Sequence, residues 1–233
     1  MPKSGIAITF ALPTESLDLR RRLRDPQQSG HLVSGQINDR EITILHTGVG
    51  AKTCNDRIEV LLHKVRPRIV VSSGFAGGIN RNFKAGDLIF AENFSDRRLL
   101  ETAEQILRDR NARTAKVFTS TSIIDSIAER DEIARASGAA AVDMETGAIA
   151  SVCNSHGVPL LALRAISDTR EQPFPAPPSV LFDLERQRTD YGRLFAYLVT
   201  HPASIPRLVA FGREINRIRA QLTDAIVALI REL

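Results

Sequence analysis

Residues 68–78, RIVVSSGFAGG, decide the fold of this chain. The first six residues form a β-branched run that predicts a buried strand, and glycines follow it at once. Two other apolar runs also carry polar groups: Val142-Asp143-Met144-Glu145 and Arg164-Ala165-Ile166-Ser167-Asp168. Ligands of open α/β folds bind outside the carboxyl ends of parallel strands. We therefore expect these three motifs to meet at the carboxyl rim of one mostly parallel sheet.

Carboxylates stand beside Met144 and Ile166 in the second and third motifs. A carboxylate that is buried among apolar side chains needs a hydrogen-bonding partner or a shifted pKa. Such groups are enriched at functional sites. The pattern therefore indicates a binding or catalytic site at this rim.

The composition is that of an ordinary globular domain. The chain has 233 residues, of which 43% are hydrophobic and 25% charged, so it is long enough to bury a large core as one domain. The net charge is +4, aromatic residues make up only 5%, and there is no Trp. This balance argues against a nucleic-acid partner bound by base stacking.

Cysteine usage and the amino-terminal sequence favour a cytoplasmic protein. Cys54 and Cys153 are about a hundred residues apart, which is typical of reduced thiols. The apolar run from Ile6 to Leu12 is too short for the core of a signal peptide, and no apolar run approaches the ~20 residues of a membrane span.

Strand and helix patterns alternate along the chain. Strands are expected over 6–12, 31–37, 41–46, 68–73, 87–91, 116–121 and 159–166, and helices over 15–24 with Thr14 as N-cap, from 50 to about 65, within 94–113, and over 126–137 and 145–156. Asn38-Asp39 lies between two strand patterns and predicts an antiparallel hairpin. The order predicts an α/β fold with one mixed β-sheet flanked by helices on both faces.

The chain changes character after residue 170. Gln172 to Pro178 is proline-rich and predicts an extended loop or lid, and the chain from Val180 onward reads as helical. We expect an α/β core over 1–170 and an extension over 171–233 that packs on the same domain. Ile205 to Leu233 is amphipathic, and packing on its own sheet is the simplest interpretation. A subunit contact or a peripheral membrane contact stays open, because the other side carries Arg207, Arg213, Arg217 and Arg219.

Five ordered motifs resemble the purine nucleoside phosphorylase superfamily. They are Thr47-Gly48-Val49-Gly50, Gly74-Phe75-Ala76-Gly77-Gly78, Ala85-Gly86-Asp87, Val142-Asp143-Met144-Glu145 and Arg164-Ala165-Ile166-Ser167-Asp168, and the resemblance covers residues 5 to about 170. Within the superfamily they are most similar to the methylthioadenosine/S-adenosylhomocysteine nucleosidases. The resemblance implies a nucleoside phosphorylase-like fold, a purine nucleoside as small-molecule partner, release of adenine by cleavage of the N-glycosidic bond, and a homodimer or larger homo-oligomer.

The resemblance also implies roles for individual residues. Glu15 corresponds to the acid that activates the attacking water, and Asp168 to the acid beside the purine. A carboxyl group offers one donor and one acceptor, which match N7 and the 6-amino group of adenine. Glu145 corresponds to the ribose ligand. The further substrate-binding candidates are Val49, Phe75, Ile123, Ile124, Met144, Arg164 and Ser167.

Some positions depart from the family pattern. Phe75 stands where many nucleosidases carry a serine, and Ser72 and Phe75 stand where the phosphorylases use arginine and serine to hold phosphate. Arg40 or Arg164 could partly substitute, so phosphate stays open as a co-substrate, although water is favoured. Ile123 or Ile124 replaces the expected purine-stacking aromatic. The stretch between Phe94 and Val117 is short, which predicts a more open 5′ side.

Two rival functions remain. A branch of the same superfamily associated with hopanoid synthesis is similar in its long basic carboxyl extension, and it removes adenine from an adenosylated lipid. A non-catalytic nucleoside-binding homologue is the other rival, although three retained carboxylates would cost such a module desolvation energy.

Taken singly, several residues also fit a structural role. Glu15 is compatible with a first-turn helix acid, Asp143 with an N-cap, and Arg164 with neutralisation of buried carboxylates. His46, His63 and His156 lack partners at metal-like spacing in the sequence, so we predict no metal site. No organic cofactor is implied either.

Overall fold

The computed structural model describes residues 5–175, 197 and 200–233. The strands are β1 Ile6–Phe10, β2 Arg24–Ser29, β3 Leu32–Ile37, β4 Arg40–His46, β5 Ile69–Gly78, β6 Leu88–Ala91, β7 Arg113–Ala115, β8 Val117–Thr119, β9 Ala141–Asp143 and β10 Leu160–Asp168. The α-helices are α1 Leu17–Arg20, α2 Ala51–Lys64, α3 Arg97–Ile106, α4 Ile127–Ser137, α5 Thr146–Ser155 and α8 Ile205–Glu232, with short 3-10 turns at Arg108–Arg110 and Pro202–Ser204.

One mixed sheet joins all ten strands. Its order is β2-β3-β4-β1-β5-β10-β6-β7, and β9 pairs with both β5 and β8. The central strands β4, β1, β5 and β10 are parallel, whereas β2, β3 and β4 form an antiparallel meander and β6 is antiparallel to β10. The carboxyl ends of β1, β5 and β10 therefore lie at one edge. The mixed α/β fold predicted from the sequence is confirmed.

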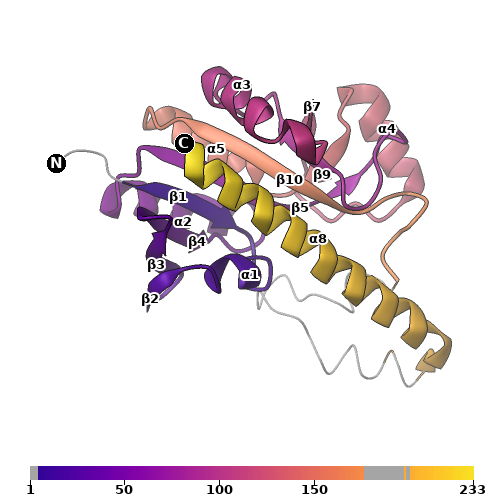
Figure 1. Cartoon of the computed structure of the whole chain (residues 1–233). Coiled ribbons are helices and arrows are strands. Elements are labelled where there is room, and N and C mark those ends of the chain that lie inside the picture. The colour runs from indigo at the N-terminus through magenta and orange to yellow at the C-terminus, as the bar shows by residue number, and fades with distance from the viewer. Residues whose placement is uncertain (1–4, 176–196, 198–199) are drawn as a thin grey trace.

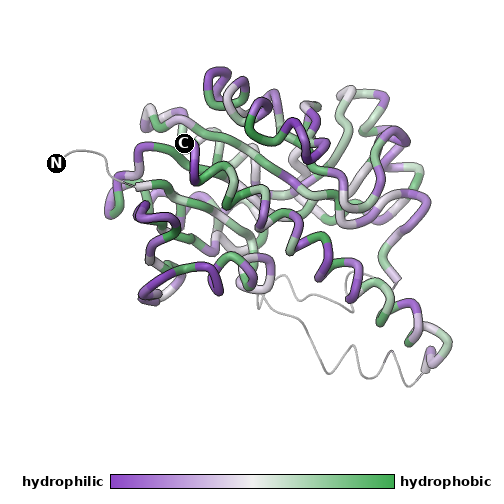
Figure 2. Tube along the Cα trace, viewed as in Figure 1, coloured by the Kyte–Doolittle hydropathy of each residue, from purple (hydrophilic) through white to green (hydrophobic). Residues whose placement is uncertain are grey.

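Helices cover both faces of this sheet (Figure 1). On one face α1, α3 and α8 pack against the strands in a single apolar cluster that includes Ile8, Leu163 and Leu222. On the other face α2 packs against α5 through a second cluster that includes Ile58 and Ile149. The central strands are mostly hydrophobic along their length, as Figure 2 shows, because both of their faces are buried.

The long helix α8 has two different halves. Its second half is part of the core, where Ile218, Leu222 and Ile226 are no more than 1% exposed. Its first half extends beyond the sheet (Figure 1), and there Ile205 is 45% and Val209 47% exposed. The amphipathic pattern thus corresponds to packing on the chain's own sheet over the second half only.

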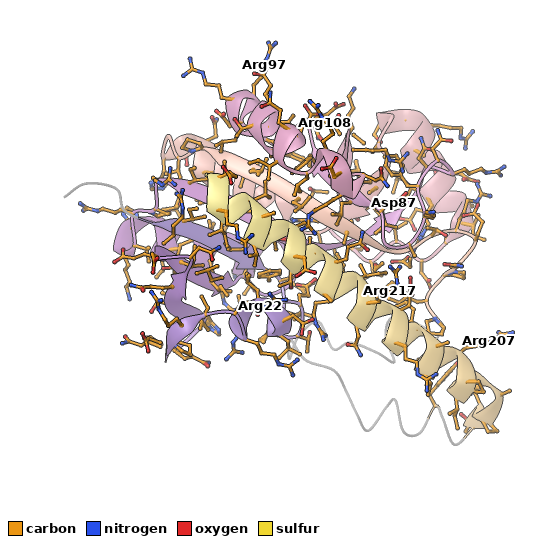
Figure 3. The ribbon with its side chains drawn as sticks, viewed as in Figure 1. Arg22, Asp87, Arg97, Arg108, Arg207 and Arg217 are labelled. Carbon is orange, nitrogen blue, oxygen red and sulfur yellow. The ribbon has the colours of Figure 1, made fainter. Side chains whose placement is uncertain are left out.

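The basic side chains of the described residues are spread over the surface and do not form a single patch (Figure 3). Figure 3 shows labelled arginines on α3, on α8 and near α1, pointing away from the body in different directions. Several have acidic neighbours, such as Arg217 with Glu214 and Arg113 with Asp87. Within the described residues, no helix combines the length and the apolar character needed to cross a lipid bilayer.

The helix predicted over 15–24 is wrong in its bounds. The structure has only α1 Leu17–Arg20, with Ser16 rather than Thr14 at the N-cap position, and Arg24 already begins β2. Pro26 excludes a helix that continues through Asp25, because proline disfavours helical backbone in the residue before it and cannot donate a helical hydrogen bond. Asp25 has φ of 51°, outside the right-handed helical region.

Other differences concern short strands. The strands β2, β7 and β9 were not predicted, and β7 and β9 have three residues each, too few for a period to show. The strand predicted to end at Ser73 continues to Gly78, so the glycine motif lies within β5 and not in a following loop. The hairpin at Asn38-Asp39 is confirmed, since both residues have positive φ as a tight turn requires. The helix expected from Val180 lies outside the described residues over 180–196 and 198–199.

Candidate active site

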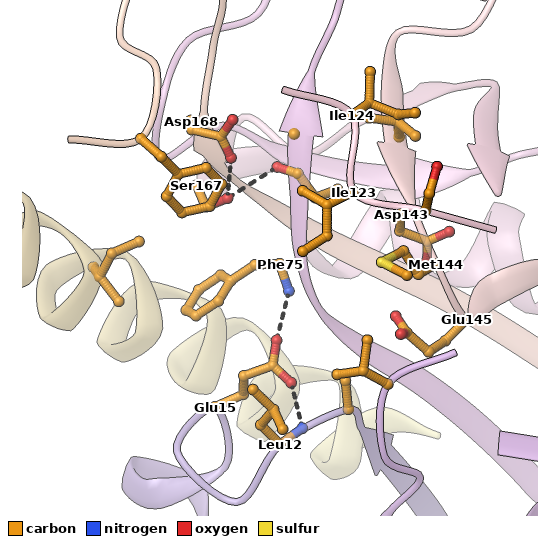
Figure 4. Close-up of a pocket in the computed structure, with 18 of the residues that line it drawn as sticks. Leu12, Glu15, Phe75, Ile123, Ile124, Asp143, Met144, Glu145, Ser167 and Asp168 are labelled. Carbon is orange, nitrogen blue, oxygen red and sulfur yellow. Dashed lines mark hydrogen bonds between the residues drawn. The ribbon is translucent and has the colours of Figure 1, made fainter. Parts of the chain in front are cut away.

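A pocket of about 440 Å³ lies at the carboxyl ends of β1, β5 and β10. Most of its wall is apolar, and carboxyl groups from three distant stretches face it, as Figure 4 shows. Nine of the predicted site residues line it, and they are Glu15, Val49, Phe75, Ile123, Ile124, Met144, Glu145, Ser167 and Asp168. Arg164 does not reach it and instead lines a small adjoining cavity.

Glu15 lies in the loop between β1 and α1 and turns back toward the sheet. Its Oε2 accepts a hydrogen bond from the backbone N–H of Leu12 at 2.9 Å, and its Oε1 accepts one from Phe75 at 3.3 Å. Burial raises the pKa of Glu15, and these two neutral donors oppose the rise. Gly74 makes the approach possible, because a Cβ there would lie 3.2 Å from Oε1 of Glu15, and its φ is 145°.

A buried histidine supports the same loop. Nε2 of His46, at the end of β4, lies 2.8 Å from Oγ of Ser16, whose hydroxyl also donates to the carbonyl of Pro13. Burial and the nearby Arg20 lower the pKa of His46 to about 4. The imidazole is therefore neutral near pH 7, and it fixes the residue that follows Glu15.

Glu145 reaches the pocket because β9 runs antiparallel to β5. The register pairs Gly77 with Val142, so the chain leaving β9 returns over the middle of β5 toward Phe75. The motif therefore lines the same pocket as the other two, although its strand runs in the opposite direction. Glu145 is 9% exposed, and its Oε1 accepts the backbone N–H of Gly50 at 3.2 Å. Burial, with the charges of Asp143 and Glu15, raises the pKa of Glu145 to about 8.

Asp168 ends β10 and is paired with an arginine. Nη2 of Arg130 donates to Oδ2 of Asp168 at 2.5 Å, and the hydroxyl of Ser167 donates to Oδ1 at 2.7 Å. Both members of the ion pair are 2% exposed. Burial raises the pKa of Asp168, and the positive charge of Arg130 opposes that rise.

Asp143 lines the pocket and forms a buried ion pair with Arg164, which lies outside the lining. Nε of Arg164 donates to Oδ2 of Asp143 at 2.9 Å, and its Nη2 donates to the hydroxyls of Ser72 and Thr146. The same Oδ2 accepts the backbone N–H of Thr146 in the first turn of α5. Asp143 therefore behaves as a helix cap, and Arg164 neutralises it.

A comparison with protein-family models decides the family. The model described as the phosphorylase superfamily matches residues 6–96 and 90–200. The chain belongs to the phosphorylase superfamily. The described fold of this superfamily member agrees with that match, since the matched residues include the whole sheet.

Named relatives of this superfamily member are remote. The 5′-methylthioadenosine/S-adenosylhomocysteine nucleosidase of Staphylococcus aureus is 26% identical over 163 residues, which are 58% of this chain and 72% of the relative. That of Staphylococcus haemolyticus is 24% identical over 195 residues, or 70% of this chain and 86% of the relative.

Solved structures share the fold over the whole chain. The nucleosidase of Campylobacter jejuni that carries the same name superposes with a TM-score of 0.76 and 18% identity, covering 99% of this chain and 100% of the other. Futalosine hydrolase of Helicobacter pylori superposes with a TM-score of 0.73 and 16% identity, covering 99% of each chain.

Sequence reasoning missed Arg130 and part of the apolar wall. Arg130 lies one turn before Ile133 and Ala134, on the partly buried face of α4. A charged residue on such a face was the signal that could have identified Arg130 as a site residue. Phe174, Phe211 and Ile215 also line the pocket. Two of them belong to the first half of α8, where the amphipathic pattern gave no reason to expect a binding wall.

Proposed function

We propose that this phosphorylase-superfamily member cleaves the N-glycosidic bond of an adenine-containing nucleoside, with water as nucleophile, and releases adenine. The observation that carries the proposal is the convergence of Glu15, Glu145 and Asp168 on one pocket of about 440 Å³. The names of the sequence relatives support the choice of nucleoside. Assembly into a homo-oligomer stays a prediction.

Asp168 is the proposed general acid. When the bond between C1′ and N9 breaks, its electron pair moves into the purine, and a proton delivered to N7 stabilises the leaving group. The raised pKa of Asp168 favours the protonated carboxyl group that can donate to N7. Ser167 and Arg130 fix the orientation of the carboxyl group.

Glu145 is the proposed ribose ligand. Its carboxyl group faces the pocket beside Met144 and can accept hydrogen bonds from the 2′ and 3′ hydroxyls. With a pKa of about 8, Glu145 is largely protonated at neutral pH. Where Glu145 is ionised, its attraction to the positive charge that develops on the sugar strengthens as the bond breaks.

Glu15 is the proposed general base. It lines both the main pocket and the small adjoining cavity, whose volume of about 10 Å³ is near the least that holds one water molecule. The hydroxyl of Ser73 lines the same cavity and has no hydrogen-bond partner among the described residues. Glu15 would take a proton from water as the water oxygen bonds to C1′.

The placement of the arginines supports water over phosphate. Arg164 donates to Asp143, Ser72 and Thr146, and Arg40 donates to the carbonyl of Arg231 far from the pocket. Arg130 is the only arginine among the described residues that line the pocket, and it is paired with Asp168. A phosphate dianion beside Glu15 would therefore find little charge to hold it.

An adenine-release assay tests the proposal. Purified protein is incubated with methylthioadenosine, S-adenosylhomocysteine or adenosine, each with and without phosphate, and free adenine is measured by chromatography. We expect release from at least one nucleoside at a rate that phosphate leaves unchanged. No release from any substrate would contradict enzymatic activity, and a phosphate-dependent rate with ribose 1-phosphate as product would contradict water as nucleophile.

A second candidate substrate is an adenosylated lipid. Phe174 and the α8 residues Phe211 and Ile215 extend the apolar wall of the pocket. Ile205 and Val209, nearer the amino-terminal end of α8, are exposed. No residue of the stretch 94–117 lines the pocket. A long apolar 5′ substituent could therefore follow α8 outward.

A series of 5′-alkylthio adenosines separates the two substrates. If the lipid is the substrate, kcat/KM should rise by about fourfold for each methylene that reaches this wall, because each buried CH₂ is worth about 0.8 kcal/mol. A flat or falling series would exclude the lipid. Phe211→Ala should flatten a rising series and leave methylthioadenosine cleavage unchanged if that small substrate does not reach α8.

A further inference from the structure

Two histidines and a glutamate meet at the far end of α2 and α5 from the pocket. They are Glu59 and His63, one turn apart on α2, and His156, which follows the last residue of α5. One ligand atom from each lies within 4.8 Å of the other two. The sequence alone gave these histidines no role, because His156 is more than ninety residues from the α2 pair.

The three side chains already face one another. Nε2 of His156 lies 2.8 Å from Oε2 of Glu59, and Nε2 of His63 lies 3.7 Å from the same oxygen. The two imidazole rings meet edge to face with centroids 5.1 Å apart. Ligand atoms around a tetrahedral Zn²⁺ lie about 3.4 Å from one another, so small side-chain rotations would bring all three to bonding distance.

The ends of two helices add negative potential at this place. His63 lies in the last turn of α2, and His156 is the C-cap residue of α5. A helix carries partial negative charge at its carboxyl end, and unpaired carbonyl groups point outward there. Two such ends together with the carboxylate of Glu59 favour a cation.

We propose that Glu59, His63 and His156 bind one Zn²⁺ ion per chain. Two imidazoles and one carboxylate form a donor set that suits divalent ions of the borderline class, of which Zn²⁺ is a member, and not Mg²⁺ or Ca²⁺. All three groups are partly exposed, with side-chain exposures of 42%, 72% and 28%, so an ion can reach them from solvent. Water completes the coordination.

The position of this site gives it a structural consequence. The residues before α2 and α5 are Gly50 and Glu145, and the N–H of Gly50 donates to Glu145 at the pocket. The two helices thus begin at the proposed ribose ligand and end at the proposed metal site. A Zn²⁺ ion would link the far ends of α2 and α5 and stabilise this pair of helices. Along the 14 residues of α2, that end is about 20 Å from the end at the pocket.

Calorimetric titration of the untagged, chelator-treated full chain with ZnCl₂ tests the site. We expect one Zn²⁺ per chain and a rise in Tm of about 5 °C when free Zn²⁺ is about 100-fold above its Kd. His63→Ala and Glu59→Gln should weaken Zn²⁺ binding at least about tenfold, since each removes one of three protein ligands. His31→Ala, which removes an exposed histidine elsewhere, should bind as the parent does.

Three outcomes would overturn the metal site. The first is no heat of Zn²⁺ binding in the parent chain, and the second is a Zn²⁺-induced Tm rise in His63→Ala that equals the rise in the parent. The third is that Glu59→Gln lowers the Tm without metal while Zn²⁺ leaves the Tm of the parent unchanged. The last outcome would reduce the cluster to an ion pair. Because the readouts are heat and Tm, they do not depend on the proposed glycosidic activity.

Discussion

The two ends of the pocket bury carboxyl groups by different means. At one end, Glu15 is held by the neutral backbone N–H groups of Leu12 and Phe75. At the other end, Asp168 is held by the guanidinium of Arg130 and the hydroxyl of Ser167. Burial raises the pKa of both carboxyl groups. The difference is that the side chains of Arg130 and Ser167 oppose this rise at Asp168, whereas main-chain donors are the main opposition at Glu15.

This difference suits a base at one end and an acid at the other. Neutral N–H donors orient the carboxylate of Glu15, and the charge of Arg164 lowers its pKa less than these two hydrogen bonds do. Arg130 keeps Asp168 from binding its proton too tightly to release it, which sets the pH at which Asp168 can donate. The following substitutions test whether the two ends differ in this way.

The largest effect is expected at the base. Glu15→Gln should lower kcat by about a thousandfold, because the amide cannot accept a proton from water. Binding of adenine or of an uncleaved analogue, measured by calorimetry, should stay within about threefold of the parent, since the side-chain shape is kept. Near-normal turnover in Glu15→Gln would remove Glu15 from the chemistry.

A somewhat smaller catalytic loss is expected at the acid, together with a loss of stability. Asp168→Asn should lower kcat by about a hundredfold. It should also cost about 3 kcal/mol in free energy of unfolding, because Arg130 would remain buried without its anion. Urea denaturation measures the second effect. Asp168→Asn combined with Arg130→Met should restore much of the stability and none of the activity, and recovery of activity would refute the acid role.

Arg130→Gln should change the pH profile more than the maximal rate. Removing the cation favours the neutral form of Asp168, so its pKa rises further. Asp168 must be protonated to act, and the alkaline limb of kcat/KM should therefore move to higher pH by about one unit or more. Arg135→Gln, on the exposed side of the same helix, is the matched control. An unchanged alkaline limb would show that Arg130 does not govern the acid.

The smallest effect is a pH-dependent change in stability at Glu145. The folded pKa of about 8 lies above the ordinary glutamate value of 4.5, so the folded state binds more protons between these values and the parent loses stability as pH rises through that window. Glu145→Gln lacks this proton uptake. Its Tm relative to the parent should rise by about 10 °C between pH 5 and pH 8.5 in differential scanning fluorimetry. A difference in Tm that is constant with pH would contradict the raised pKa.

Local sequence predicted the long elements well. The apolar runs of β1, β5 and β10 and the periodic patterns of α2, α4 and α5 carry enough residues for a period to show, and the structure has them within a few residues. The strands β7 and β9 are too short for that. The helix predicted over 15–24 stops before Pro26, and no residue in the sequence marks its observed end at Arg20.

The order of motifs placed nine candidates on one pocket, because strand ends in a parallel sheet meet at one edge whatever their distance in sequence. The motif order did not predict which side chains pair with one another. That Arg130 pairs with Asp168, and that Arg164 pairs with Asp143, depends on how α4, α5 and β10 pack, and no spacing encodes it. The convergence of His63 and His156 has the same origin.

The sequence by itself determined the α/β class, the family and the residue types available for chemistry, since these follow from periodicity, turn residues and motif order. Only the tertiary structure decided which carboxyl group faces a cation and which faces main-chain N–H groups. The reason is that a pKa depends on distances of a few ångströms between groups that the chain brings together from far apart, and on the burial that packing imposes.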